Sequence, residues 1–362
     1  MGNRANYIII EDGQSHIFFS RWEALTTPSV MLSGPEATLR YIRQLDPDEW
    51  LLNDTWVEGG ILMDVDAHRA LFWGGDAIAG SPYLRRPLLA VLPLLWPGWS
   101  IGWALFGVVD LARAIGWDIS RVLDDDFVDI AFLTGGETVV TEAQILESLC
   151  TKGSETILTI RWKTGELKDF LITLQESFSE PGTHRHLAAP YQVLSLGPRL
   201  LSILPAESIT SLPKEGSKQE PKKGAYVDEE TQTIWIWENE TLDPRYLEAI
   251  GRRWPGWQVQ GHVEGLVHHA ILSGRDSAEI GVSDQRAIQE LIEELTQDQG
   301  FDPMRLSQAI QQTFPSEDLQ GMKFGKGFFN AATPPLTPQE RREVLERLLL
   351  GLLGNGETRM VE

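Results

Sequence analysis

The tetrapeptide Trp-Pro-Gly-Trp occurs twice in this chain of 362 residues, at 96–99 and again at 254–257. A matching run of apolar residues around one glycine follows each copy: Ile101, Leu105, Gly107, Val108 and Val109, and then Val259, Val263, Gly265, Leu266 and Val267. Upstream of each copy an Asp precedes a Trp by seven residues, as Asp66 with Trp73 and Asp228 with Trp235. Self-similarity at a long, nearly fixed offset is typical of a repeated structural unit. We therefore expect two related modules in tandem.

The two copies differ in length just before the tetrapeptide. Trp73 and Trp96 are 23 residues apart, whereas Trp235 and Trp254 are 19 apart. Removing four residues takes out about one turn of α-helix and leaves the remaining buried face nearly in register. The difference therefore predicts a helix at this place in both modules.

Turn and capping signals predict the other elements. Asp12-Gly13 lies between two apolar runs and predicts a hairpin over 7–20, because these residues tolerate the positive φ values of a two-residue turn. Ser33 with Glu36 predicts a capping box at the start of a helix. Further hairpins are expected over 61–73, 156–173 and 224–237. The expected fold class is α+β, with two tandem related modules of β-hairpins and helices around a mainly antiparallel sheet and a helical C-terminal section.

These signals divide the chain into four segments. The first module is expected over 1–117, a connecting segment over 118–150, the second module over 151–275 and the helical C-terminal section over 276–362. Within the second module, the polar stretch 213–223 predicts a mobile linker. Thr141 predicts the start of a short helix in the connecting segment, and Thr337 with Glu340 predicts a capping box for the last helix. That helix has a broad apolar face, which must dock on the body of the protein or on a partner.

One run could be mistaken for a membrane span. Leu88 to Val109 carries no formal charge and is long enough to cross a bilayer. Pro93 and the first tetrapeptide would interrupt a helix there, and the same segment of the second copy is polar. We therefore expect no membrane span.

The charge balance bears on partners and location. With 31 Lys and Arg against 52 Asp and Glu, the net charge is −21, which argues against binding nucleic acid by electrostatics alone. A negative surface instead speeds association with a basic protein partner. The one cysteine, Cys150, cannot form an internal disulfide. A chain without an internal disulfide suits the reducing environment of the cytoplasm.

Two stretches carry a resemblance. The chain opens Met1-Gly2-Asn3-Arg4-Ala5-Asn6, followed by an Ile-rich hairpin that ends in Ser20-Arg21-Trp22, and its Val-Asp hairpin leads to Trp-Pro-Gly-Trp. In these features it resembles a group of uncharacterised bacterial proteins, over roughly the first third of the chain. The resemblance implies a bacterial cytoplasmic origin and carries no activity.

The densest group of potential metal ligands is His262, Glu264, His268 and His269. Imidazole and carboxylate together suit a metal or acid–base site. However, His262 and His268 are six residues apart across an expected junction of strand and helix, and this spacing does not place two histidines on one helix face. The first copy has Ala104, Phe106, Asp110 and Leu111 at these places, so such a site would belong to one module. The favoured interpretation is therefore a set of surface histidines with no bound metal, and His262, His268 and His269 are the candidates if a metal does bind.

Four other features carry less chemistry. His184-Arg185-His186 offers two ligands, too few for a structural zinc site. Asp124-Asp125-Asp126 lacks the spacing of an EF-hand and fits a solvated turn. The glycine-rich stretch Lys323 to Phe329 lacks the phosphate-loop pattern. Cys150 has no histidine near it in the sequence.

Tryptophan is concentrated in the two copies, which indicates a structural requirement. Packing in the core is one interpretation, and exposed recognition at a cleft between the modules is the other. The candidates for recognition are Trp73, Trp99, Trp103, Trp235 and Trp257.

Three hypotheses about function remain. The favoured one is a non-enzymatic bacterial cytoplasmic protein that binds another protein, such as a toxin-neutralising or accessory subunit, through its acidic surface and aromatic cleft. The alternative is a metal-dependent or acid–base hydrolase with His262, Glu264 and His268 at the cleft. The third is a small-ligand sensor. The sequence identifies no cofactor.

Overall fold

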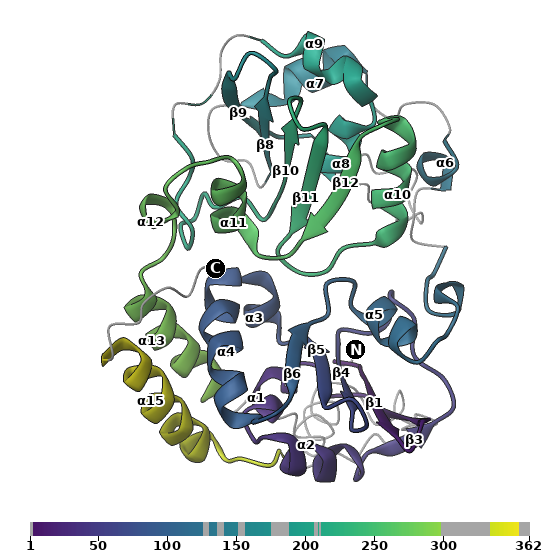
Figure 1. Ribbon diagram of the computed structural model, residues 1–362, viewed down its shortest axis with the longest axis vertical. Helices are drawn as coiled ribbons and strands as arrows, with labels where there is room; N and C mark the ends of the chain where they lie inside the picture. Colours follow the sequence, from purple (N-terminus) through teal and green to yellow (C-terminus); the bar gives the residue numbers. More distant parts are fainter. Residues whose placement is uncertain are drawn as a thin grey trace, which may run out of the picture. The chain divides into compact units, whose positions relative to one another are not determined.

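The computed structural model describes residues 3–125, 130–135, 141–150, 156–174, 188–205, 209, 211–297 and 334–354 (Figure 1). The chain divides into two compact units. Unit 1 comprises 1–79, 84–123 and 288–362, and unit 2 comprises 80–83 and 124–287. Each unit is built around a six-stranded sheet, and the fold class is α+β.

Unit 1 holds a sheet with the order β3-β2-β1-β4-β5-β6. Its strands are β1 Ala5–Glu11, β2 Gln14–Ser20, β3 Asp46–Asp48, β4 Gly59–Asp64, β5 Arg69–Trp73 and β6 Ser100–Trp103. The helices of this part of the chain are α1 Thr27–Met31, α2 Pro35–Ile42, α3 Asp76–Gly80, α4 Pro82–Leu95, α5 Val108–Ala114 and the short 3₁₀ turn η1 Ile119–Arg121. The expected hairpin forms, with Asp12 and Gly13 both at positive φ between β1 and β2.

Unit 2 holds a sheet with the order β12-β11-β10-β8-β9-β7. Its strands are β7 Leu149–Cys150, β8 Thr156–Arg161, β9 Leu167–Ile172, β10 Lys223–Asp228, β11 Thr233–Glu238 and β12 Gln258–His262. Its helices are α6 Ile130–Leu133, α7 Glu142–Ser148, α8 Ala189–Leu194, η2 Gly197–Arg199, α9 Leu200–Ile203, α10 Pro244–Arg253, α11 Gly265–Leu272 and α12 Ser277–Ile280. Two longer helices follow in the sequence, α13 Asp284–Leu295 and α15 Pro338–Gly354, and the chain from residue 288 onward belongs to unit 1.

Both sheets are mixed, which corrects part of the expectation of a mainly antiparallel sheet. Between the described strands of each sheet, three neighbouring pairs are antiparallel and two are parallel. The hairpins β1–β2 and β4–β5 are antiparallel within themselves, but β1 and β4 run parallel. The physical reason is that a helical connection brings the chain back before the second hairpin starts, so both hairpins enter the sheet in the same direction.

Five strands of the two sheets follow the same order and directions, and the pairing registers match residue by residue. Trp73 lies opposite Gly60 in unit 1, and Trp237 lies opposite Gly224 in unit 2. His68 and Gln232, each one residue before β5 or β11, both have a positive φ. The register thus matches Trp73 with Trp237 and not with Trp235, a correction of two residues to the alignment by sequence. A shift of two keeps each side chain on its face of the sheet, so the sequence pattern conceals it.

The two Trp-Pro-Gly-Trp segments form the same turn. The amide of the last Trp donates to the carbonyl of the first, at 3.0 Å in unit 1 and 3.1 Å in unit 2, and the glycine has φ of 81° and 84°. This arrangement is that of a turn with Pro at its second and Gly at its third position. The first Trp of each segment, Trp96 or Trp254, is fully buried, and its indole N–H donates to the carbonyl of Met31 or Leu194.

The helix before this turn has fourteen residues as α4 and ten as α10, which agrees with the predicted difference of one turn. Pro93 does not end α4, contrary to expectation, because the helix continues to Leu95 with Pro87 and Pro93 inside it. A proline removes one hydrogen bond, and packing of Leu88, Val91 and Leu92 in the core offsets the loss. No helix in the described part of the chain is long and apolar enough to span a membrane.

Capping predictions had mixed outcomes. Thr141 with Gln144 and Thr337 with Glu340 form capping boxes. Ser33 does not cap α2, because its hydroxyl donates back to the Val30 carbonyl and Gly34 takes the N-cap position. The stretch 213–223, for which mobility stays a prediction, contacts the rest of unit 2: Glu215 and Glu220 are buried, and the Glu215 amide donates to the Ile280 carbonyl. The last helix, α15, buries Leu345 and Leu349 on its apolar face.

The two faces of the sheet in unit 2 differ in character. One face is apolar and packs against α8, α9 and α10, with Leu158, Ile160, Val227 and Ile236 among its members. The other face packs against α11 and carries a smaller apolar cluster that includes Ile157, Leu171 and Trp237. Polar residues occupy the rest of this second face, and the candidate site lies there.

Candidate functional site

Three potential metal ligands converge at the end of β12 and the start of α11. One ligand atom each from His262, Glu264 and His268 lies within 4.8 Å of the others. The rings of His262 and His268 have centroids 4.5 Å apart, and His268 Nδ1 is 2.8 Å from a carboxylate oxygen of Glu264. The His262 side chain is buried, whereas His268 and Glu264 are 30% and 59% exposed. The cluster therefore has one side closed by protein and one side open to solvent.

The chain brings these residues together through a turn and not through one helix face. His262 ends β12, Glu264 is the N-cap of α11, and His268 lies one turn along that helix. Gly265 makes the abrupt entry into the helix possible, because it has φ of 70° and an added Cβ would lie 2.7 Å from Pro82. The spacing argument is correct that His262 and His268 share no helix face, but the strand end places His262 over the first helical turn.

Two tryptophans of β11 surround the histidines. The ring of Trp237 stacks on that of His262 at 6.2 Å between centroids and 23° between planes. Trp235 lies 6.1 Å from His262 and 6.2 Å from His268. The predicted binding residue Trp235 is thus half-buried beside the cluster, and Trp237, which the sequence analysis did not single out, is fully buried beneath it.

A buried chain of hydrogen bonds extends from Trp237 across the sheet. The Trp237 indole N–H donates to His269 Nδ1 at 3.1 Å, and His269 Nε2 lies 2.7 Å from the Thr159 hydroxyl. Thr159 in turn donates to a carboxylate oxygen of Asp169 at 2.6 Å, and Arg275 pairs with the other oxygen. All of these groups except Arg275 are buried.

The donors and acceptors along this row of hydrogen bonds fix the tautomer of the His269 ring. An indole nitrogen can only donate, so His269 Nδ1 must accept and the neutral ring must carry its proton on Nε2. Burial, with smaller contributions from Arg275 and His268, lowers the pKa of His269 to about 3. The ring is therefore neutral near pH 7. Burial also raises the pKa of Asp169, against the hydrogen bonds from Thr159 and Arg275.

The same positions in unit 1 are apolar. By pairing register, Thr159 corresponds to Ile8 and Asp169 to Ile17, because each pair lies opposite its partner in the antiparallel hairpin. After the shared turn, His262, His268 and His269 correspond to Ala104, Asp110 and Leu111. Ile8, Ile17, Ala104 and Leu111 all belong to one hydrophobic cluster with Trp73. The fold itself therefore does not require polar residues at these places.

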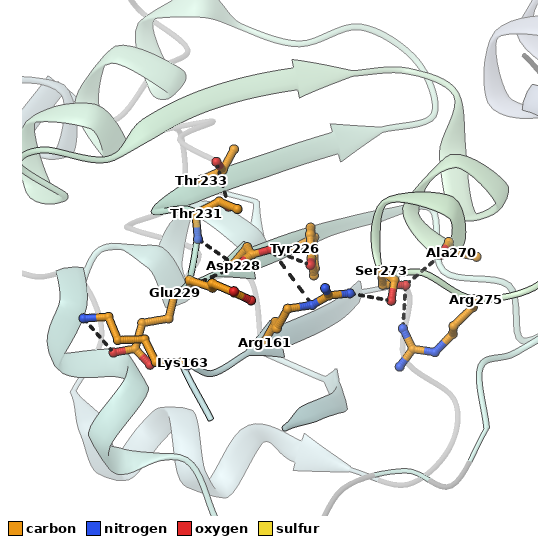
Figure 2. A network of polar contacts seen from close by, with 11 residues as sticks. Arg161, Lys163, Tyr226, Asp228, Glu229, Thr231, Thr233, Ala270, Ser273 and Arg275 are labelled. Carbon is orange, nitrogen blue, oxygen red and sulfur yellow. Dashed lines mark hydrogen bonds and ion pairs between the residues drawn. The ribbon is translucent and has the colours of Figure 1, made fainter. Parts of the chain in front are cut away.

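A second polar network adjoins the hydrogen bonds between Trp237 and Asp169, on the same face of the unit 2 sheet (Figure 2). Arg161 lies 4.0 Å from Asp228 and donates to the Ser273 carbonyl at 3.0 Å. Tyr226 donates to Asp228 at 3.0 Å, and Arg275 donates to the Ser273 hydroxyl at 2.5 Å. These contacts tie the ends of β8 and β10 to the end of α11, the helix that carries His268 and His269.

The chain matches no family model, curated protein or solved structure.

The remaining tryptophan candidates lie in different places. Trp73 packs in the core of unit 1. Trp99 and Trp257 are half-buried and each contacts the first Trp of its own tetrapeptide edge-on, at 5.4 and 4.7 Å. Trp103, also half-buried, stacks with the guanidinium of Arg85. Trp257 and Trp162 line a cavity of about 420 Å³ in unit 2.

For the other candidate residues named from the sequence, the described residues add no evidence of a functional site. Asp125, the second residue of Asp124-Asp125-Asp126, forms an ion pair with Arg245 at 3.0 Å. Asp126, His184 to His186 and Lys323 to Phe329 lie outside the described residues, as does the side chain of Cys150. Sequence reasoning missed Thr159, Asp169 and Trp237. A signal exists for Thr159 and Asp169, since each is a polar residue among apolar residues of its strand.

Proposed function

We propose that unit 2 binds a divalent metal ion of zinc's ligand preference through His262, Glu264 and His268, and that this ion supports a hydrolytic reaction. The observation that carries the proposal is the convergence of two imidazoles and a carboxylate within 4.8 Å. Two His and one Glu form the ligand set of a group of catalytic zinc sites, which keep a fourth position for water or substrate.

The exposure of the cluster fits an open position. His262 is closed in by Trp235 and Trp237, while Glu264 and His268 face solvent. A bound zinc ion would supply Lewis acidity and a water that ionises near neutral pH. The residues of this chain would hold the ion and keep one side of it dry, and the exposed side would admit a substrate.

The contrast between the units supports a gain of function in one copy. We propose that the two sheets arose by tandem duplication, which their shared strand order and matched registers support. Unit 1 has Ala104, Phe106 and Asp110 where unit 2 has the three ligands. Metal binding is accordingly proposed for unit 2 alone.

The hypothesis of a non-enzymatic interaction protein stays a prediction, together with its bacterial cytoplasmic location and its basic partner. Trp73, one of its five aromatic contacts, is in the core and cannot serve without unfolding. The small-ligand sensor also stays a prediction.

Calorimetric titration of the metal-free full chain with Zn²⁺ tests the proposal. We expect one site with a dissociation constant in the micromolar range or below, and its loss in the variants His262→Ala and His268→Ala. His16→Ala is the matched control, because His16 is an exposed histidine of β2 outside the cluster. Absence of a saturable site in the wild-type protein, or equal loss in the control, would overturn the metal assignment.

Hydrolysis is tested separately, with zinc-loaded protein and p-nitrophenyl acetate and phosphate. We expect turnover of at least one ester in the wild type and none above background in His262→Ala. A protein that binds zinc with the expected ligands but leaves both esters intact would contradict the hydrolytic part of the proposal.

A further inference from the structure

We infer that the buried chain of Trp237, His269, Thr159 and Asp169 acts as a positioning device for the metal ligand His262. The inference rests on the proposed metal site and adds residues that do not touch the metal themselves. Its direct link to the cluster is Trp237, whose ring stacks on His262.

This buried arrangement of polar groups costs free energy. Burying hydroxyl, imidazole and carboxyl groups is unfavourable unless every one is hydrogen-bonded. Unit 1 avoids the cost at the corresponding positions with Ile8, Ile17 and Leu111. Since the same sheet and helix pack there without polar groups, stability of the fold does not account for Thr159, Asp169 and His269.

The hydrogen bonds from Trp237 through to Asp169 fix the orientation of the Trp237 indole. Trp73 and Trp237 occupy the same register, and each packs with the helix that follows the last strand of its module, α5 after β6 or α11 after β12. Of these two indoles, Trp237 alone donates its N–H to a side chain among the described residues, namely to the ring of His269, and that bond fixes the rotation of the indole plane. His269 is fixed in turn by Thr159 and Asp169.

The orientation of the Trp237 indole in turn affects the metal ligand His262. An imidazole binds a metal in the plane of its ring, so the orientation of that plane decides whether a ring nitrogen can reach the ion. His262 lies nearly parallel to Trp237, at 23°. A fixed indole therefore holds the His262 plane in the orientation in which it meets His268 and Glu264.

The test compares Zn²⁺ affinity and the visible absorption spectrum of the Co²⁺-substituted protein among three variants. Trp237→Phe keeps a stacking ring but removes the N–H. The double variant Thr159→Ile with His269→Leu installs the residues of unit 1 at two of the three corresponding positions. Trp73→Phe is the matched control in unit 1. Circular dichroism establishes that each variant is folded.

We expect both unit 2 variants to remain folded, to bind Zn²⁺ about 10- to 100-fold more weakly and to show an altered Co²⁺ spectrum, while Trp73→Phe matches the wild type. Wild-type affinity and spectrum in folded Trp237→Phe would overturn the inference and leave the metal site standing. Absence of Zn²⁺ binding in the wild type would overturn the proposed function first. If the double variant does not fold, Trp237→Phe decides the question alone.

Discussion

The two tryptophans of one tetrapeptide should differ sharply in their contribution to stability. Trp254 is fully buried, and its indole N–H donates to the Leu194 carbonyl at 2.8 Å, whereas Trp257 is half-buried. Trp254→Phe leaves that carbonyl without its donor in the core, at about 2 kcal/mol. The smaller ring also removes about 1 kcal/mol of apolar burial. Together these lower the free energy of unfolding by about 3 kcal/mol, whereas Trp257→Phe should lower it by less than about 1 kcal/mol.

Differential scanning calorimetry of the full chain measures the effect. For a unit of this size, about 3 kcal/mol corresponds to a fall in melting temperature of roughly 6 to 12 °C. Trp96→Phe and Trp99→Phe repeat the comparison in unit 1, where Trp96 donates to the Met31 carbonyl at 2.7 Å. If the two units melt separately, each pair of variants should move its own transition. Equal destabilisation by Trp254→Phe and Trp257→Phe would refute the assignment of a structural role to the first Trp and a peripheral one to the second.

Burial raises the pKa of Glu23, so the folded state holds the Glu23 proton more tightly than the unfolded state does. The free energy of unfolding should therefore fall as the pH rises above the usual carboxyl range. Glu23→Gln should flatten this dependence in urea unfolding at pH 4 to 8, and an unchanged profile would contradict the prediction. An added Cβ at Gly224 would lie 2.7 Å from the Ile157 carbonyl oxygen and 2.8 Å from the Trp237 nitrogen, so Gly224→Ala should destabilise unit 2 by more than about 2 kcal/mol. Gly256 has no atom within 4 Å of an added Cβ, so Gly256→Ala should cost only the strain of its positive φ. If thermal melts show Gly256→Ala to be the more destabilising variant, this account of the packing is contradicted. Thr337→Ala removes the capping box of α15 and should lower the stability of this helix by about 1 kcal/mol. Hydrogen exchange of the amides in the first turn of α15 should then become faster, and unaltered exchange would argue against the cap.

Much of the fold could be predicted because it depends on local chemistry. The hairpin at Asp12-Gly13, the length difference between α4 and α10 and the caps at Thr141 and Thr337 each depend on a few neighbouring residues. The parallel pairing of β1 with β4 and of β8 with β10 could not be predicted in this way. It depends on which edge of the first hairpin the second one joins, and no local signal specifies that edge.

The candidate site was only partly predictable. His262, Glu264 and His268 were named from residue type, but the separation of six residues hid their convergence, which depends on the turn at Gly265. Trp237, Thr159 and Asp169 come from three strands and meet His269 only in the folded sheet. The tryptophan pattern was ambiguous because the same residue type fills the core as Trp96 and Trp254 and lies near the surface as Trp99 and Trp257.

X-ray absorption at the zinc edge of the full chain loaded with one equivalent of Zn²⁺ tests the central claim most directly. The account predicts two imidazole ligands at about 2.0 Å, one carboxylate oxygen and one exchangeable oxygen, with one imidazole lost in His262→Ala. A spectrum without imidazole scattering, or one that His262→Ala and His268→Ala both leave unchanged, would contradict it.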